Sequence, residues 1–202
     1  MCKGFGEITF ASRIARRDFY LKTFKSAVRN REFAVSAEIF LRPETDAEAL
    51  RVQTDVLRDS VDGILLTDRQ FSDFVVKAKF RVHSGDSGFY FRAERVKSAV
   101  SVHGFQVEVD TSQETGGLYE TGGRAWVHRP TAEVIKKRGY ERGEWTDLEL
   151  SAIGRNIIVK INGVVSTELK NDKGRLKGYI GLQLHGGQVM HVEYKDIAIL
   201  EK

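Results

Sequence analysis

Alternation of apolar and polar residues is strongest in residues 85–110, which read GDSGFYFRAERVKSAVSVHGFQVEVD. Two runs within it, residues 88–92 and 105–110, place an aromatic or β-branched residue at every second position. Because successive side chains of a strand point to opposite faces, each run predicts a strand with one core face and one polar face. The polar positions are Tyr90 and Arg92 in the first run, and Gln106, Glu108 and Asp110 in the second.

A third run repeats the pattern in residues 181–185, where Gln183 and His185 alternate with leucines. Three such strands could form a polar surface on one sheet. The alternative is an ordinary wet face, since antiparallel sheets commonly expose one side to water. The strand expected over residues 71–82 has that ordinary kind of face, with Lys77, Lys79 and Arg81 as its polar residues. The Arg, Glu, Asp and His side chains of the three runs favour a functional surface instead.

Short strands with turn signals fill most of the chain after residue 71. The clearest is a hairpin over residues 156–165, in which Asn162-Gly163 supplies the positive φ angles of a type I′ turn. Further strands are expected over residues 145–152, 179–185 and 189–200. The pattern predicts an all-β fold, a jelly-roll sandwich of two antiparallel sheets.

Residues 1–68 have a different pattern and predict a mixed α/β appendage. Residues 33–41 and 63–67 read as strands. Between them, Thr45 and Glu48 form a capping box, followed by an apolar stripe of Ala49, Val52 and Val56 that favours a helix. We therefore expect two parts: an N-terminal segment over residues 1–68, and a sandwich domain over residues 69–202.

Composition bounds the classes of protein that this chain can be. It has 202 residues, of which 41% are hydrophobic and 30% charged, as in an ordinary globular protein. No apolar run approaches the ~20 residues of a membrane helix, and as written no secretory signal opens the chain. The single cysteine, Cys2, excludes an intrachain disulfide and a cysteine-based zinc cluster.

Charge is uneven along the chain. Residues 1–42 contain 9 Lys and Arg against 4 Asp and Glu, whereas residues 43–202 contain 23 against 24. The body therefore has no basic excess, and nucleic-acid binding is not indicated. No feature of the sequence indicates a protein partner.

Several motifs of residues 71–200, about two-thirds of the chain, resemble those of the 3-keto-disaccharide hydrolase family. They are Phe71-Ser72-Asp73-Phe74, residues 85–92, residues 105–110, Gly117-Leu118-Tyr119, Gly143-Glu144-Trp145, Asn162-Gly163 and residues 181–186. The resemblance implies a concanavalin A-like jelly roll with a sugar site on its concave face, cleavage of glycosides oxidised at C3, and periplasmic or extracellular relatives. The chain departs from the family at Asp86, where Asn is expected. Asp can make the same turn hydrogen bonds.

The activity implied by this resemblance has clear chemical requirements. A C3 ketone acidifies the C2 proton, so the glycosidic bond can break by elimination, and water adds afterwards. This route needs a base, an acid and a group that stabilises the enolate. The candidates for proton transfer are Glu108, Asp110 and His185, and those for substrate binding are Tyr90, Arg92, Gln106, Tyr119, Trp126 and Gln183.

Two questions stay open at this level. The same carboxylate and imidazole groups could hold a divalent metal, although their spacing does not demonstrate a ligand set. The sandwich could also be a non-catalytic, lectin-like carbohydrate-binding module, because a fold does not by itself fix function.

Residues 33–68 also resemble the first strand, helix and second strand of the methylenetetrahydrofolate reductase barrel. In that resemblance Glu38 stands at the position of a catalytic acid near the flavin. One such unit cannot close a barrel. We therefore expect a fused fragment without reductase activity.

Overall fold

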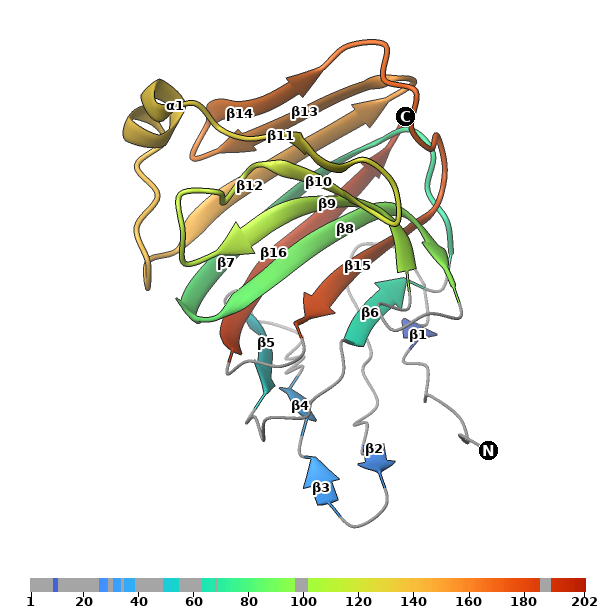
Figure 1. Ribbon diagram of the computed structural model, residues 1–202, viewed down its shortest axis with the longest axis vertical. Coiled ribbons are helices and arrows are strands. Elements are labelled where there is room, and N and C mark those ends of the chain that lie inside the picture. Colours follow the sequence, from blue (N-terminus) through green and yellow to red (C-terminus); the bar gives the residue numbers. More distant parts are fainter. Residues whose placement is uncertain are drawn as a thin grey trace.

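The computed structural model of the chain contains two packed β-sheets (Figure 1). It describes residues 9–10, 26–28, 31–33, 35–38, 49–54, 63–67, 69–96, 102–185 and 190–202. Within these residues each of the two sheets has seven strands, and β2 (Ser26–Val28) pairs with β3 (Arg31–Phe33) apart from them. The predicted all-β sandwich of two mainly antiparallel sheets is confirmed.

The first sheet carries the polar runs. In spatial order its strands are β1 (Thr9–Phe10), β6 (Gly63–Thr67), β15 (Tyr179–Leu184), β8 (Asp86–Arg95), β9 (Val102–Asp110), β10 (Leu118–Thr121) and β11 (Ala125–His128). Neighbouring strands are antiparallel except β1 and β6, which are parallel. The central strands β8 and β9 thus lie between β15 and β10.

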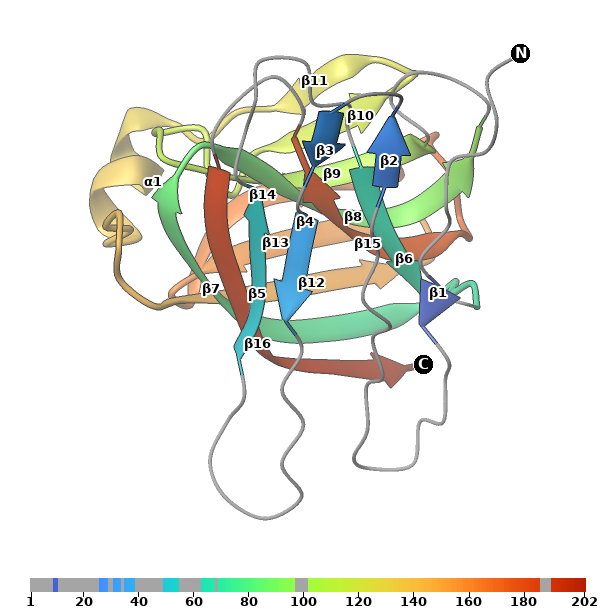
Figure 2. The same ribbon diagram turned by 90° about the horizontal axis from the view of Figure 1, so that it is seen from below.

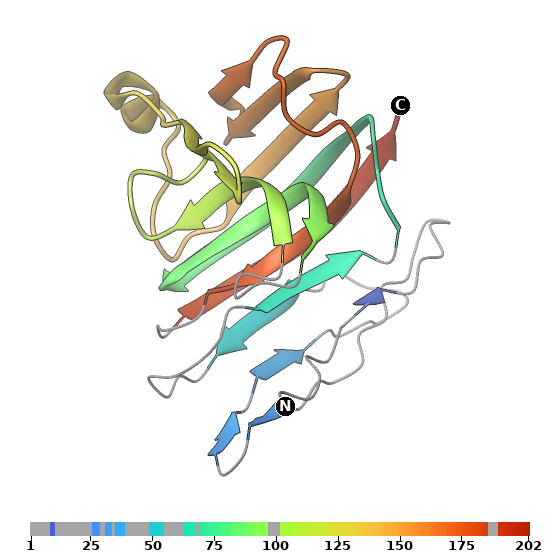
Figure 3. The same cartoon turned by 45° about the vertical axis from the view of Figure 1, so that its right-hand side comes forward.

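The second sheet lies behind the first (Figures 1 and 3). In spatial order its strands are β14 (Val164–Leu169), β13 (Asn156–Ile161), β12 (Thr146–Ile153), β7 (Phe74–Ser84), β16 (Met190–Glu201), β5 (Ala49–Thr54) and β4 (Val35–Glu38). Viewed from below, β16, β5 and β4 lie side by side (Figure 2). A short helix, α1 (Ala132–Lys137), lies beside β14. No helix in the described ranges is long and apolar enough to span a bilayer.

The core lies between the sheets and is built from the apolar positions of the alternating runs. Phe89, Phe91 and Phe105 of the first sheet are fully buried there, together with Phe74 and Phe80 of the second. The Phe91 and Phe105 rings stack with centroids 5.2 Å apart. The polar positions of β8 and β9 therefore lie on the outer face of the first sheet, as the alternation predicts.

The expected hairpin turn is also confirmed. Asn162 and Gly163 have φ angles of 48° and 78°. The Asn162 side chain accepts a hydrogen bond from the Asp147 backbone N–H and donates to the carbonyls of Arg138 and Gly139. The turn therefore positions β13 against β14 and also fixes the loop after α1.

The prediction of a helix after Glu48 is wrong for the residues that the structure describes. Ala49–Thr54 is a strand that pairs with β16, placing Val52 opposite Val192. Alternation of Leu50 and Val52 with Arg51 and Gln53 also has the two-residue period of a strand, and pairing with β16 decides between the two patterns. The capping box at Thr45 and Glu48 lies outside the described residues.

The expected reductase fragment finds no support. The strands β4 and β5 pair antiparallel with each other, and β6 belongs to the other sheet. A barrel unit of strand, helix and strand would instead bring two parallel strands into one sheet. The strand expected over residues 33–41 is present only in part. Phe33 is the last residue of β3, and Val35–Glu38 forms β4.

Candidate functional site

A row of polar side chains crosses the outer face of the first sheet. We call it the polar row; its members are Gln183, Gln106, Glu108, Asp86 and His185. Gln183 and His185 come from β15 and the residue after it, Asp86 from β8, and Gln106 and Glu108 from β9. The row therefore begins and ends on the same side of β8.

Consecutive members of the polar row are in contact. The Gln106 Nε2 atom donates to Gln183 Oε1 at 3.3 Å and to Glu108 Oε2 at 3.1 Å. The carboxyl groups of Glu108 and Asp86 are close neighbours, and each affects the pKa of the other. Asp86 Oδ2 lies 3.7 Å from His185 Nε2. Two neighbouring carboxyl groups favour a state in which one of them carries a proton.

Burial and charge together favour a proton on Glu108. Its side chain is almost wholly buried, and this burial raises its pKa to about 10, with Asp86 as the next contributor. Burial also raises the pKa of Asp86. Among the described residues, the Oδ1 atom of Asp86 is buried and accepts no hydrogen bond.

The backbone beneath the row is fixed by small residues. The Ser87 hydroxyl, on the core side of β8, donates to the Gln183 carbonyl at 2.9 Å and lies 3.1 Å from the Tyr194 hydroxyl. A Cβ on Gly88 would lie 2.5 Å from the side chain of Gln106. The side chain of Gln106 can lie flat across β8 because residue 88 is glycine.

An aromatic pair flanks the row. Tyr119 lies opposite Gln106 on β10, and its ring meets that of Trp126 on β11 edge to face at 5.5 Å. The Arg129 guanidinium lies 4.2 Å from the centre of the Trp126 ring. Both aromatic side chains are half-buried. Partly exposed aromatic rings beside hydrogen-bonding groups have the chemistry that binds sugar rings.

Three predicted site residues lie elsewhere or have other partners. Tyr90 shares the outer face but belongs to a buried apolar cluster with Leu66, and its hydroxyl contacts Thr121 at 2.8 Å. The carboxylate of Asp110 accepts hydrogen bonds from Ser112 and Thr115, so it closes the turn after β9.

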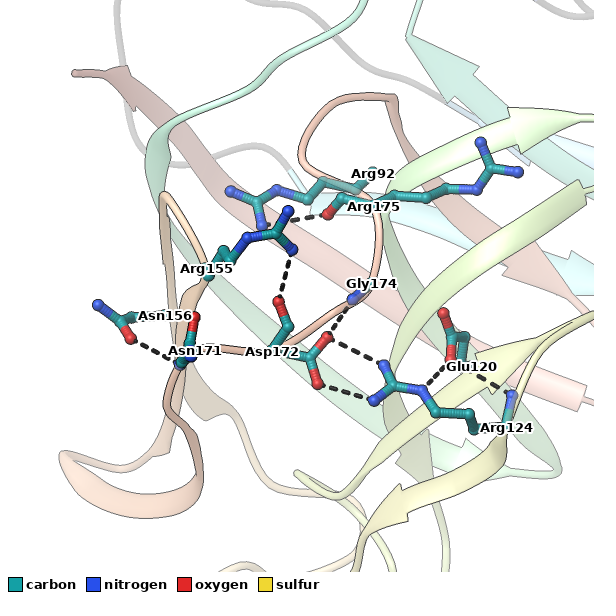
Figure 4. Close-up of polar contacts among 9 residues, drawn as sticks. All are labelled: Arg92, Glu120, Arg124, Arg155, Asn156, Asn171, Asp172, Gly174 and Arg175. Atoms are coloured by element: carbon teal, nitrogen blue, oxygen red, sulfur yellow. Dashed lines mark hydrogen bonds and ion pairs between the residues drawn. The ribbon is translucent and has the colours of Figure 1, made fainter.

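Arg92 is not brought to the polar row. A bulge between Phe91 and Glu94 breaks the alternation, and Arg92 has a φ angle of 48°. Its side chain is 1% exposed and donates to the backbone carbonyls of Ser72 and Arg175 at the end of the sandwich (Figure 4). The contacts of Arg92 in this structure therefore hold backbone segments together at the end of the sandwich.

One member of the row, Asp86, was not among the predicted site residues. The sequence pattern predicts only a turn residue at this position, where the family has Asn. Counting back by twos from Tyr90 places Gly88 and Asp86 on the outer face, so the signal was present in the sequence.

Within the described residues, the polar row contains no cluster of three metal-ligating atoms for the predicted divalent metal. Among the described residues, three ligand atoms of His, Asp or Glu come within 4.8 Å of one another only at His83, His191 and Glu193, on the second sheet. A metal in the polar row stays a prediction.

Comparison with solved structures shows that proteins of low sequence identity share this fold. Carbohydrate binding module CBM66 from Bacillus subtilis has a TM-score of 0.56 and 11% identity, over 84% of this chain and 95% of that one. A putative glycosyl hydrolase from Parabacteroides distasonis has a TM-score of 0.58 and 13% identity, over 76% and 81%. A Bacillus subtilis protein with a galectin-like fold has a TM-score of 0.55 and 14% identity, over 76% and 82%.

Sequence comparison gives the family. No curated protein matches the chain significantly. The family model described as the 3-keto-alpha-glucoside-1,2-lyase-like domain matches residues 27–200, most of the chain and including much of the expected N-terminal segment. By this match, the chain belongs to the family of 3-keto-alpha-glucoside-1,2-lyase-like domains.

Proposed function

We propose that this domain cleaves glycosides whose sugar is already oxidised at C3, by elimination across C1 and C2. The observation that carries the proposal is the polar row, in which the buried Glu108 lies beside Asp86 and Asp86 lies 3.7 Å from His185. An acid and an imidazole on one face are two of the three groups that this elimination requires, and the third stabilises the enolate.

In the proposed reaction His185 takes the C2 proton of the substrate. The electron pair of the C2–H bond forms the C1–C2 double bond, and the bond from C1 to the glycosidic oxygen breaks. Glu108 gives its proton to that departing oxygen. Its raised pKa suits a proton donor and is unsuited to a base at neutral pH.

The remaining members of the row have binding roles in this proposal. The side-chain amides of Gln106 and Gln183 are the hydrogen-bonding groups next to Glu108, and we assign them to the sugar hydroxyls and the C3 oxygen. Tyr119 and Trp126 would hold the apolar face of the ring. Water adds to C1 after the elimination, so the net reaction is hydrolysis.

A non-catalytic carbohydrate-binding module is the second candidate. It is favoured by the half-buried pair of Tyr119 and Trp126, which could hold a sugar without any proton transfer. In such a module the protonated Glu108 would only donate a hydrogen bond to a sugar hydroxyl.

Release of the aglycone from a 3-keto-glucoside tests the proposal. We expect turnover by the parent and a loss of about 100- to 10,000-fold in kcat for Glu108→Gln and for His185→Ala. Glu168→Gln is the matched control, because Glu168 is an exposed carboxylate on β14 of the other sheet. It should leave kcat unchanged.

The outcomes separate the two candidates. Turnover that survives both substitutions would overturn the assignment of the polar row. A folded parent that binds the sugar in calorimetry without turnover would favour the binding module, and the loss of that binding in Trp126→Ala would confirm the aromatic pair as its surface.

A further inference from the structure

A second cluster of polar side chains lies on the outer face of the other sheet, independent of the proposed sugar site. His83 is near the end of β7, and His191 and Glu193 are near the start of its neighbour β16. One ligand atom from each lies within 4.8 Å of those from the other two. The His83 Nε2 atom is 2.9 Å from Glu193 Oε2.

An irregularity in strand pairing brings the two imidazoles together. His191 pairs with Ser84 and Val192 with Val82, so the strand register shifts at this point and the backbone of His83 is left opposite no single residue of β16. The rings of His83 and His191 lie 4.2 Å apart at an interplanar angle of 30°. Bulges re-aim side chains in this way and are common next to functional sites.

The three residues form a donor set with the chemistry of a transition-metal site. We propose that His83, His191 and Glu193 bind a divalent transition-metal ion, with Zn²⁺ as the best match. Two imidazoles and a carboxylate leave one position of a tetrahedral zinc ion for water. The side chain of Glu193 is 2% exposed whereas that of His83 is 35% exposed, so the set combines a buried anion with access from solvent.

One neighbouring charge opposes a cation at this site. The Arg81 guanidinium lies 2.5 Å from Glu193 Oε2 and is stacked at 4.5 Å on the ring of Trp145. It balances the buried carboxylate when no metal is bound, and its positive charge weakens metal binding. Arg81→Gln should therefore bind the ion more tightly than the parent does.

The location of the cluster links it to the first sheet. Only Ser84 and Gly85 separate His83 from Asp86, the first residue of β8. On the other strand, His191 follows Met190, whose sulfur accepts from the His185 backbone N–H at 3.1 Å. A bound ion would cross-link the two strand ends that lead to Asp86 and His185.

The test uses tag-free protein stripped with a chelator and titrated with Zn²⁺ by calorimetry. We expect one equivalent to bind, and the melting temperature to rise with the concentration of Zn²⁺. His83→Ala and His191→Ala should weaken binding by about 100-fold or more, beyond the 10- to 100-fold typical of a lost supporting partner. His128→Ala is the control, since His128 lies on β11 and contacts Thr167; it should bind as the parent does.

The alternative is that His83 and Arg81 serve only to hold Glu193 by hydrogen bonds. A parent that shows no saturable Zn²⁺ binding, or variants at His83 and His191 that bind like the parent, would establish that alternative and overturn the proposal. Imidazole NMR signals of the parent give a readout that needs no variant. Of the five histidines, His83 and His191 should shift with Zn²⁺, and a shift of His185 in their place would also overturn the assignment.

Discussion

The carboxyl group of Glu108 lies among groups that favour its neutral form. Burial is the largest of these influences, and the neighbouring Asp86 and Asp110 add like charge. A buried carboxyl group that stays protonated at neutral pH can donate a hydrogen bond or a proton there. This residue therefore links the stability of the domain to its proposed chemistry.

Stability should fall with rising pH because of this one residue. The pKa of Glu108 is about 10 in the folded chain against an ordinary value of 4.5, so between these values the folded state holds a proton that the unfolded state releases. Raising the pH therefore favours unfolding, by up to about 1.4 kcal/mol per unit. Glu108→Gln keeps the shape of the neutral form and removes the titration.

Urea unfolding of the parent and of Glu108→Gln at several pH values from about 5 to about 9 measures this effect. The difference in free energy of unfolding should shift in favour of the variant as the pH rises. Two curves that stay parallel would show that Glu108 is ionised in the folded chain.

Side chains on regular strands could be predicted, whereas those at irregularities could not. Gln106, Glu108 and Gln183 lie on the outer face as alternation predicts. Arg92 lies within the bulge between Phe91 and Glu94, which no residue type in residues 85–95 indicates, so alternation predicted the wrong neighbours for its side chain. The partners of Asp110 depend on Thr115, and a period-two pattern contains no information about a turn.

At the scale of single elements, Gly88 and Gly178 differ in what an added side chain would contact. The atoms nearest to a Cβ on Gly88 would belong to the flexible side chain of Gln106, at 2.5 to 2.6 Å. A Cβ on Gly178 would meet the backbone of Arg92 and Ala93 at 2.3 to 2.6 Å, and a backbone cannot rotate away.

We expect Gly88→Ala to fold with nearly the parent's stability but to lose turnover or sugar binding, because Gln106 must leave Glu108. Gly178→Ala should lose about 1–3 kcal/mol of stability as an overpacked site. Urea unfolding and the aglycone assay on both variants check this contrast. Equal stability losses in the two would contradict it.

Elements with local turn signals were predictable, and elements fixed by distant pairing were not. The hairpin around Asn162-Gly163 carries its own signal and is confirmed. The segment Ala49–Thr54 fits both a helix and a strand locally, and its partner β16 lies about 140 residues away in sequence, where no local pattern can report it.

At the scale of the whole molecule, the end of the sandwich is closed by an arginine network (Figure 4). Arg92 connects β8 of the first sheet to Ser72 and Asp73, just before β7 of the second. Nearby, Asp172 accepts from Arg124 at 2.8 Å and 3.0 Å, and its carbonyl accepts from Arg155. The loop between β14 and β15 is thereby held to both sheets.

Arg92→Met should destabilise the domain by about 2–4 kcal/mol, because it removes a 1% exposed guanidinium group and its hydrogen bonds to the Ser72 and Arg175 carbonyls. Lys77→Met on the exposed face of β7 is the control and should change stability by no more than about 0.5 kcal/mol. Urea unfolding measures both. A stable Arg92→Met that fails to bind sugar would restore the substrate-binding role predicted from the sequence.

The position of β16 has a consequence for how quickly the chain can fold. This strand lies between β7 and β5, so the second sheet is divided until residues 190–201 take their place. The first sheet likewise joins β8 to β15, nearly a hundred residues later in the chain. Sheets assembled from such distant segments form on the slow side of the range for single domains, in milliseconds to seconds. Until then the edges of β5 and β7 are open to pairing with other chains, which makes dilute conditions the better choice for refolding.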